Sequence, residues 1–271
     1  KEVREIAKAT AERWGLEVSI NEKGNEQMEK KRIRLSAISI LHYVKLTLRS
    51  ALFLGVLIFY ILGKLHVIRH YYPLLICVWV FFVIDMVLRF FPSRLESMGC
   101  QKQFARNYEP IGENITPVNQ SWKVTATVAL VWFALNGAIG ALYLTHVIDG
   151  GILLLISIAY SICDIICILF FCPFQTWFMK NRCCTTCRIY NWDFAMMFTP
   201  LVFLPSIYTY TLLGFSLLLL LRWEITYRMH PERFATNTNR CLDCSRCKEK
   251  LCSHKTKTKN KPYLIKSLRY S

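Results

Sequence analysis

The chain has 271 residues, of which 54% are hydrophobic, and its formal net charge is +16. Its apolar residues gather in runs that approach or exceed about 18 residues with few charges, which excludes an ordinary soluble domain and indicates a polytopic membrane protein. No nucleic-acid recognition motif accompanies the charge, so we expect contact with anionic membrane lipid and no binding to nucleic acid.

Residues 1–35 are charged and form the first predicted domain, an N-terminal arm outside the membrane. Apolar residues recur at helical spacing over residues 3–11, and residues 16–20 alternate between apolar and polar as in a short strand. A basic cluster at 30–34 then precedes the membrane, where it can contact anionic headgroups.

Residues 36–221 form the predicted membrane domain. Four transmembrane spans are expected at about 46–63, 74–91, 124–145 and 151–171, and a fifth apolar segment covers 194–221. Pro200 and Pro205 interrupt that fifth segment, which is either one kinked span or a re-entrant hairpin. Residues 222–271 form a basic, cysteine-rich tail.

The basic residues predict the topology. Eleven Lys and Arg lie in residues 1–49, thirteen lie in 222–271, and none lies in the link at 146–150. The positive-inside rule therefore places both termini in the cytoplasm, which requires an even number of crossings. Because two crossings need about 20 residues each, we favour the hairpin over 194–221. The predicted fold class is all-α, with four transmembrane helices, a re-entrant hairpin and a cysteine-rich cytoplasmic cap.

Charged residues inside the spans are candidates for proton movement. Asp85 lies one helical turn before Arg89, which predicts a local ion pair, and a proton-relay role for Asp85 is the alternative. Asp164 has no basic residue within one turn, so we expect its partner on another helix, in water or in a cofactor. Arg49 lies near a span end, where its side chain can extend to the headgroups.

Twelve cysteines are present, and eight of them form two groups of four near the C-terminal half of the chain. The first group is Cys172, Cys183, Cys184 and Cys187, and the second is Cys241, Cys244, Cys247 and Cys252. The second group has C-x2-C-x2-C-x4-C spacing, close to the run in which one loop wraps an iron–sulfur cluster. These patterns predict two [4Fe–4S] clusters, with four-thiolate zinc as the alternative.

Cys172-Pro173-Phe174 at a span end and the 241–252 run resemble the polytopic membrane ferredoxins, which oxidise or reduce quinol for periplasmic reductases. The chain lacks their fuller C-x3-C-P motifs and their two complete C-x2-C-x2-C-x3-C-P runs. The resemblance implies an electron carrier between a cytoplasmic partner and a membrane-associated acceptor, as one subunit of a larger redox complex.

Other cysteine roles remain open. Zinc bound by Cys184, Cys187, Cys241 and Cys244 would make the chain a stapled membrane scaffold or transport component. We expect Cys163 and Cys167, which share a helix face, to be packing residues, and Cys100 to be the replacement if either Cys183 or Cys184 is not a ligand.

The basic tail would attract an acidic cytoplasmic redox partner.

The histidines and the remaining motifs do not indicate a haem site or an active site. His42, His66, His70 and His146 lie at span ends, which predicts exposed interfacial side chains in preference to haem ligands. No nucleophile–base set or nucleotide-binding loop is present, so catalysis by this chain alone is not predicted.

Overall fold

The chain divides into two compact units, Lys1–Leu35 and Ser36–Ser271. The computed structural model describes residues 16–20, 26–30, 36–64, 72–94, 96–112, 115–181, 183–243, 246–247 and 249. In the first unit, strand β1 (Leu16–Ile20) pairs antiparallel with β2 (Glu26–Lys30). The strand predicted at 16–20 is thus confirmed, and the helix expected over 3–11 lies outside the described residues.

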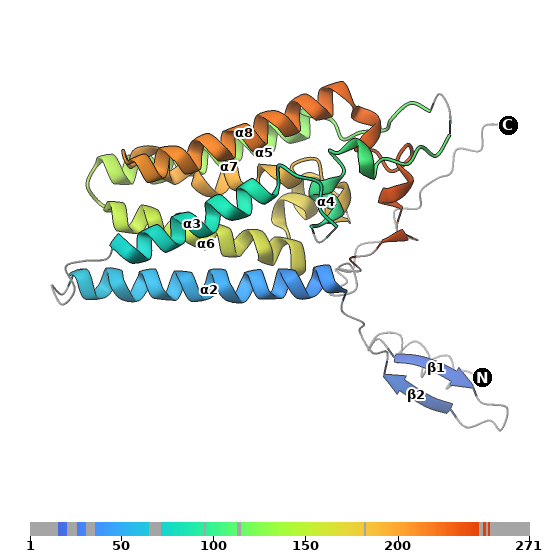
Figure 1. The fold of residues 1–271 in the computed structure, drawn as a ribbon, viewed down its shortest axis with the longest axis horizontal. Helices are drawn as coiled ribbons and strands as arrows, with labels where there is room; N and C mark the ends of the chain where they lie inside the picture. Colours follow the sequence, from blue (N-terminus) through green and yellow to red (C-terminus); the bar gives the residue numbers. More distant parts are fainter. Residues whose placement is uncertain are drawn as a thin grey trace. The chain divides into compact units, whose positions relative to one another are not determined.

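Long helices build the second unit. They are α2 (Ala37–Lys64), α3 (Tyr72–Leu88), α5 (Trp122–Leu144), α6 (Gly150–Leu169) and α8 (Ile207–Met229), and Figure 1 shows them lying along one another. In the described part of the chain, α2, α5 and α6 are long and apolar enough to cross a membrane. The chain is therefore an integral membrane protein, with helices as its spanning elements.

Short helical elements connect the long ones. They are α4 (Met98–Gln101), η1 (Ala105–Asn107), η2 (Phe174–Phe178), η3 (Cys184–Thr186), η4 (Tyr190–Trp192), α7 (Asp193–Phe198), η5 (Thr199–Phe203), η6 (Pro231–Arg233) and η7 (Arg240–Leu242). The described residues of the second unit include no strand, which agrees with the predicted all-α membrane domain; the β1–β2 pair lies in the first unit.

The predicted spans match the helices with two differences. Helix α2 begins at Ala37, before the expected start near Leu46, because the half-buried Lys45 has carboxylate partners and does not end the helix. The fifth apolar segment is broken at its prolines, as predicted: α7 passes into η5 at Pro200, and Ser206 caps α8 just after Pro205. Helix α8 then continues to Met229, beyond the predicted end.

The core of the second unit lies between α2, α3, α6, α7 and α8. Phe82 is almost fully buried and packs edge-on against Phe198 at 5.3 Å between ring centroids. Large apolar side chains also remain exposed along the helices, including Leu54, Ile58, Leu130, Phe133, Leu217 and Leu218. In a protein with membrane-spanning helices, such exposed faces contact lipid.

The two ends of the helix bundle differ in chemistry. At one end, the Tyr60 hydroxyl donates to the Asp149 carboxylate at 3.0 Å, where α2 finishes and α6 begins. The other end holds the start of α2, the end of α6, α4 and the loop 172–187; we call it the cysteine end (Figure 1).

Gly140 gives a test of the packing between α5 and η5. A Cβ built on Gly140 would lie 2.1 Å from Cζ of Phe203, whereas one on Gly137 of the same helix would meet nothing within 4 Å. We expect Gly140→Ala to destabilise the protein by about 1–3 kcal/mol through overpacking. Unfolding in mixed micelles measures this change.

Gly137→Ala is the matched control and should leave stability unchanged or raise it, since alanine favours helix. Adding Phe203→Leu to Gly140→Ala should restore part of the loss. Equal effects of the two glycine variants would contradict the described packing.

Candidate functional site

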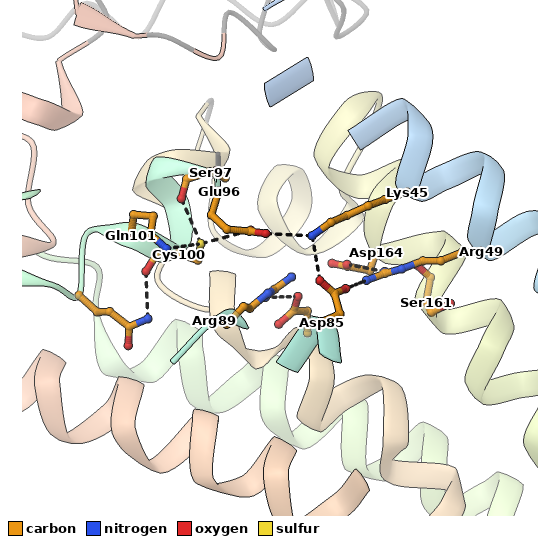
Figure 2. Close-up of polar contacts among 12 residues, drawn as sticks. Lys45, Arg49, Asp85, Arg89, Glu96, Ser97, Cys100, Gln101, Ser161 and Asp164 are labelled. Carbon is orange, nitrogen blue, oxygen red and sulfur yellow. Dashed lines mark hydrogen bonds and ion pairs between the residues drawn. The ribbon is translucent and has the colours of Figure 1, made fainter. Parts of the chain in front are cut away.

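A buried ion network joins three long helices at the cysteine end (Figure 2). Lys45 Nζ on α2 lies 2.9 Å from Asp85 Oδ1 on α3 and 3.0 Å from Glu96 Oε1 in the following loop. Lys45 and Arg89 outweigh the effect of burial and hold the pKa of the Glu96 carboxyl below its usual value.

Arg49 is the central cation of this network. Its side chain is 0% exposed; one terminal nitrogen lies 2.9 Å from Asp85 Oδ2, and the other donates to the Ser161 carbonyl at 2.7 Å and to Asp164 Oδ2 at 3.2 Å. The predicted extension of Arg49 to the headgroups is therefore wrong, because carboxylates from α3 and α6 hold it inside. Asp164 has the interhelical partner that the sequence predicted.

Arg89 extends the network to α7. Helix α3 ends at Leu88, so Arg89 lies in the following turn, where it forms an ion pair with Asp193 and stacks 4.4 Å from the Phe194 ring centroid. The pair expected between Asp85 and Arg89 is thus replaced by a wider network. Of the described residues, this network contains three cations and the four carboxylates of Asp85, Glu96, Asp164 and Asp193.

His42 lies close to these charges and is buried, with 6% of its surface exposed. Its two ring nitrogens have no hydrogen-bond partner among the described residues. The prediction of an exposed interfacial histidine is therefore wrong for His42, because the α2 helix continues past it into the bundle. His146 is exposed as predicted, and His66 and His70 lie outside the described residues.

A cavity of about 140 Å³ borders the ion network and lies between α5, α6, α7 and the loop 172–187. Five cysteines line it: Cys163, Cys167, Cys172, Cys184 and Cys187. Asp164 and Asp193 also line it, so the cavity connects the thiols to the buried charges. Cys163 and Cys167, expected to be packing residues only, therefore belong to the candidate site.

Gln175 organises two of these thiols. Its backbone N–H donates to Cys172 Sγ at 3.4 Å, and its side-chain Oε1 accepts from Cys184 Sγ at 3.3 Å. Cys184 Sγ also lies 3.8 Å from the carbonyl oxygen of Ile168 on α6. The Cys184 thiol thus faces the membrane helices.

Two other cysteines lie outside the cavity lining. Cys183 Sγ lies 2.7 Å from the Thr185 hydroxyl. Cys100 is buried and donates to the Ser97 carbonyl at 3.1 Å, and burial raises the pKa of its thiol to about 12. Cys100 is therefore held as a neutral thiol.

Lys102 fixes the loop 172–187 against the rest of the cysteine end. Its side chain is fully buried, and Nζ donates to the carbonyl oxygens of Thr185 at 2.9 Å and Cys187 at 2.8 Å. Burial lowers the pKa of this ammonium to about 8. The Lys102 ammonium therefore places a positive charge beside the loop at neutral pH.

Glu249, a residue of the tail, is held at the same end. The Ser97 hydroxyl donates to its carboxylate at 2.9 Å, and the Ser39 hydroxyl donates to its backbone carbonyl at 2.9 Å. Burial raises the pKa of Glu249 to about 7, and the nearby Cys183 adds to the shift. The tail at Glu249 is thus anchored beside α2 and the loop that carries the first cysteine group.

The first cysteine group lies at the same end as Cys241 and Cys247, the two members of the second group that the structure describes. No three His, Cys, Asp or Glu side chains in the described ranges are placed to hold one metal ion. Cys241 and Cys247 are half-buried, and Cys244 and Cys252 lie outside the described residues. The eight-ligand assignment stays a prediction.

Sequence reasoning missed several residues of this site. Lys45 and Arg49 lie four residues apart on α2, and this spacing could have indicated one cationic face directed at Asp85. Asp193, Lys102 and Glu249 act through contacts from distant segments, and nothing local in the sequence marks them. Comparison with protein-family models, curated proteins and solved structures finds no match.

Arg49 should be essential to the fold of the bundle. We expect Arg49→Met to lower the free energy of unfolding by about 3–5 kcal/mol, because it leaves buried carboxylates without their partner. Unfolding of the purified chain in mixed micelles measures the loss.

Leu48→Ala, which removes a largely exposed side chain on the same helix, is the control and should change stability much less. Adding Asp164→Asn to Arg49→Met should recover part of the loss, since it removes one of the unpaired charges. If Arg49→Met left the free energy of unfolding unchanged, the network would not be what stabilises the bundle.

Proposed function

We propose that this protein is a membrane-embedded electron carrier whose two iron–sulfur clusters are held by cysteine thiolates at its cysteine end. The observation that carries the proposal is the cavity of about 140 Å³ lined by five cysteines at the junction of the helices and the loop 172–187. Five thiols around one cavity match the donor set of a cluster site better than they match ordinary packing.

The cavity lining favours a revised ligand set for the first cluster. Cys172, Cys184 and Cys187 come from the predicted group, and Cys167 takes the place of Cys183, which lies by Thr185 and outside the lining. When bound, an iron–sulfur cluster supplies a one-electron couple whose potential depends on nearby charge, hydrogen bonds and solvent exposure.

The surrounding residues are suited to that couple. Ile189 and Phe174 line the cavity and pack with Met179, so part of its wall is apolar. The buried ammonium of Lys102, held on the loop carbonyls, supplies positive charge that favours the reduced and more negative form of the site. Asp164 lines the same cavity and is the residue best placed to exchange a proton, whereas Asp85 contacts two cations within the network.

The second cluster is assigned to Cys241, Cys244, Cys247 and Cys252. The Glu249 anchor supports a position beside the loop 172–187, because this residue lies between the last two of these cysteines. A short separation of two clusters would allow electrons to pass from a cytoplasmic partner toward a membrane-associated acceptor. Other subunits of a redox complex and an acidic cytoplasmic protein are the partners that fit.

The proposed topology has four crossings and a re-entrant hairpin with both termini in the cytoplasm. A Cβ on Gly150, at the start of α6, would lie 2.8 Å from Leu204, whereas Asp193 pairs with Arg89 near the cysteine end. The α7–η5 segment therefore runs along the bundle away from the cysteine end, and α8 returns. This arrangement supports the hairpin and the same-side placement of the cysteine groups.

A zinc-stapled scaffold is the alternative function. It requires Cys184 and Cys187 to converge with Cys241 and Cys244 on one ion. The Cys184 thiol instead faces Gln175 and the α6 carbonyls, which favours a ligand in the cavity over one shared with the tail.

Anaerobic purification tests the cofactor. We expect iron and acid-labile sulfide, a broad absorbance in the violet and a paramagnetic signal on reduction. Cys184→Ser should remove about half of the iron. Cys77→Ser, which changes an exposed cysteine on α3, should leave the iron content unchanged.

Cys183→Ser distinguishes the predicted ligand set, which includes Cys183, from the revised set, which includes Cys167. This variant should retain both clusters if Cys167 is the fourth ligand. A colourless protein with stoichiometric zinc and no iron would replace the electron-carrier proposal with the scaffold.

Cysteine labelling in sealed vesicles tests the topology. A single reactive cysteine introduced at Ser271 and one introduced at Ser36 should both react from the cytoplasmic face, with His146→Cys as the opposite-face control. If the two end positions were labelled from opposite faces, the proposed re-entrant hairpin would be wrong.

A further inference from the structure

We infer that a second, open pocket at the cysteine end binds a phosphate-bearing anion. The pocket has a volume of about 360 Å³ and lies between the α8 end, the loop before α5 and the segment 179–188. This volume is within the range of small-molecule sites, roughly 300–1,000 Å³. The thiol-lined cavity is separate, and the inference does not depend on the proposed electron transfer.

The charge of the pocket selects an anion. Its described lining contains three cations, Lys102, Lys180 and Arg188, and no carboxylate. Glu224 lies nearby and compensates Arg188 through a bidentate ion pair, with one contact of 2.8 Å. The charges of Lys102 and Lys180 have no carboxylate partner among the described residues, so the lining keeps a net positive charge.

Lys180 can donate to a ligand, because its side chain is exposed at the pocket and an ammonium group has three N–H donors. Lys102 is fully buried, with Nζ held on the carbonyls of Thr185 and Cys187, and it contributes its positive charge to the lining without a direct contact. Lys180 is exposed at the pocket and has a φ of 49°, a left-handed conformation that non-glycine residues rarely adopt. Such backbone strain gathers at ligand sites, where it fixes a side chain in position.

Neutral polar groups complete the lining. The Gln120 side-chain N–H donates to the Met179 carbonyl at 2.7 Å, while its buried Oε1 has no partner among the described residues. This oxygen would accept from a ligand hydroxyl. Asn119, Asn181 and Thr236 add further donors and acceptors.

The chemistry therefore fits a phosphate group attached to a hydroxyl-bearing organic group. Tyr227 lines the pocket, so the site lies near the C-terminal end of α8. A glycerol-type phospholipid headgroup and a small soluble phosphate ester both have this chemistry. The two sources differ in whether the ligand stays in the bilayer.

Binding of glycerol 3-phosphate to the purified full chain tests the inference. Lys180→Asn removes the ammonium while keeping a residue that tolerates left-handed backbone. We expect this variant to bind about tenfold more weakly, as for the loss of one charge-assisted hydrogen bond. Lys123→Asn, which changes an exposed lysine at the start of α5, should bind like the parent.

Nanodiscs distinguish the sources. If the parent chain unfolds at a higher temperature in phosphatidylglycerol than in phosphatidylcholine, and Lys180→Asn does not, the ligand is a lipid headgroup. If glycerol 3-phosphate binds equally well in both bilayers, the ligand is a soluble ester. The inference is overturned if neither ligand binds, or if Lys180→Asn and Lys123→Asn weaken binding equally, since only general charge would then be involved. Unchanged unfolding temperatures of the ligand-free variants exclude misfolding as the cause.

Discussion

The contacts of Arg49 hold the cysteine end of the bundle together. A guanidinium with 0% exposure joins α2 to Asp85 on α3 and to Asp164 on α6. A charge in this position is costly unless it is paired on several sides, so the three helices are fixed in one arrangement. Because Asp164 and Asp193 also line the thiol cavity, the same network sets the electrostatic surroundings of the candidate centre.

Two further sets of contacts hold distant segments of the chain at the cysteine end. The buried ammonium of Lys102 holds the first cysteine loop by its backbone carbonyls, and Glu249 attaches the tail to Ser97 and Ser39. Each anchor satisfies polar groups that burial would otherwise leave without partners. As a result, Cys172, Cys184 and Cys187 lie at the same end of the bundle as Glu249 of the tail.

Apolar run lengths predicted the approximate positions of α2, α3, α5 and α6, because the membrane allows few other solutions. Pro200 and Pro205 also located the break between η5 and α8. The tertiary partners were harder to predict. Arg49 near a span end has the same local sequence signal whether it extends to headgroups or enters the core, and its partners on α3 and α6 decide between the two. Cys163 and Cys167 likewise line a cavity only because the loop 172–187 folds back on them.

X-ray absorption at the iron and zinc edges, measured on the anaerobically purified chain, tests the central claim most directly. We expect iron surrounded by sulfur with a second iron nearby. We also expect a smaller iron signal in Cys167→Ser and in Cys184→Ser than in the parent chain. Zinc surrounded by four sulfurs with no neighbouring metal, or an iron signal that neither substitution changes, would contradict it.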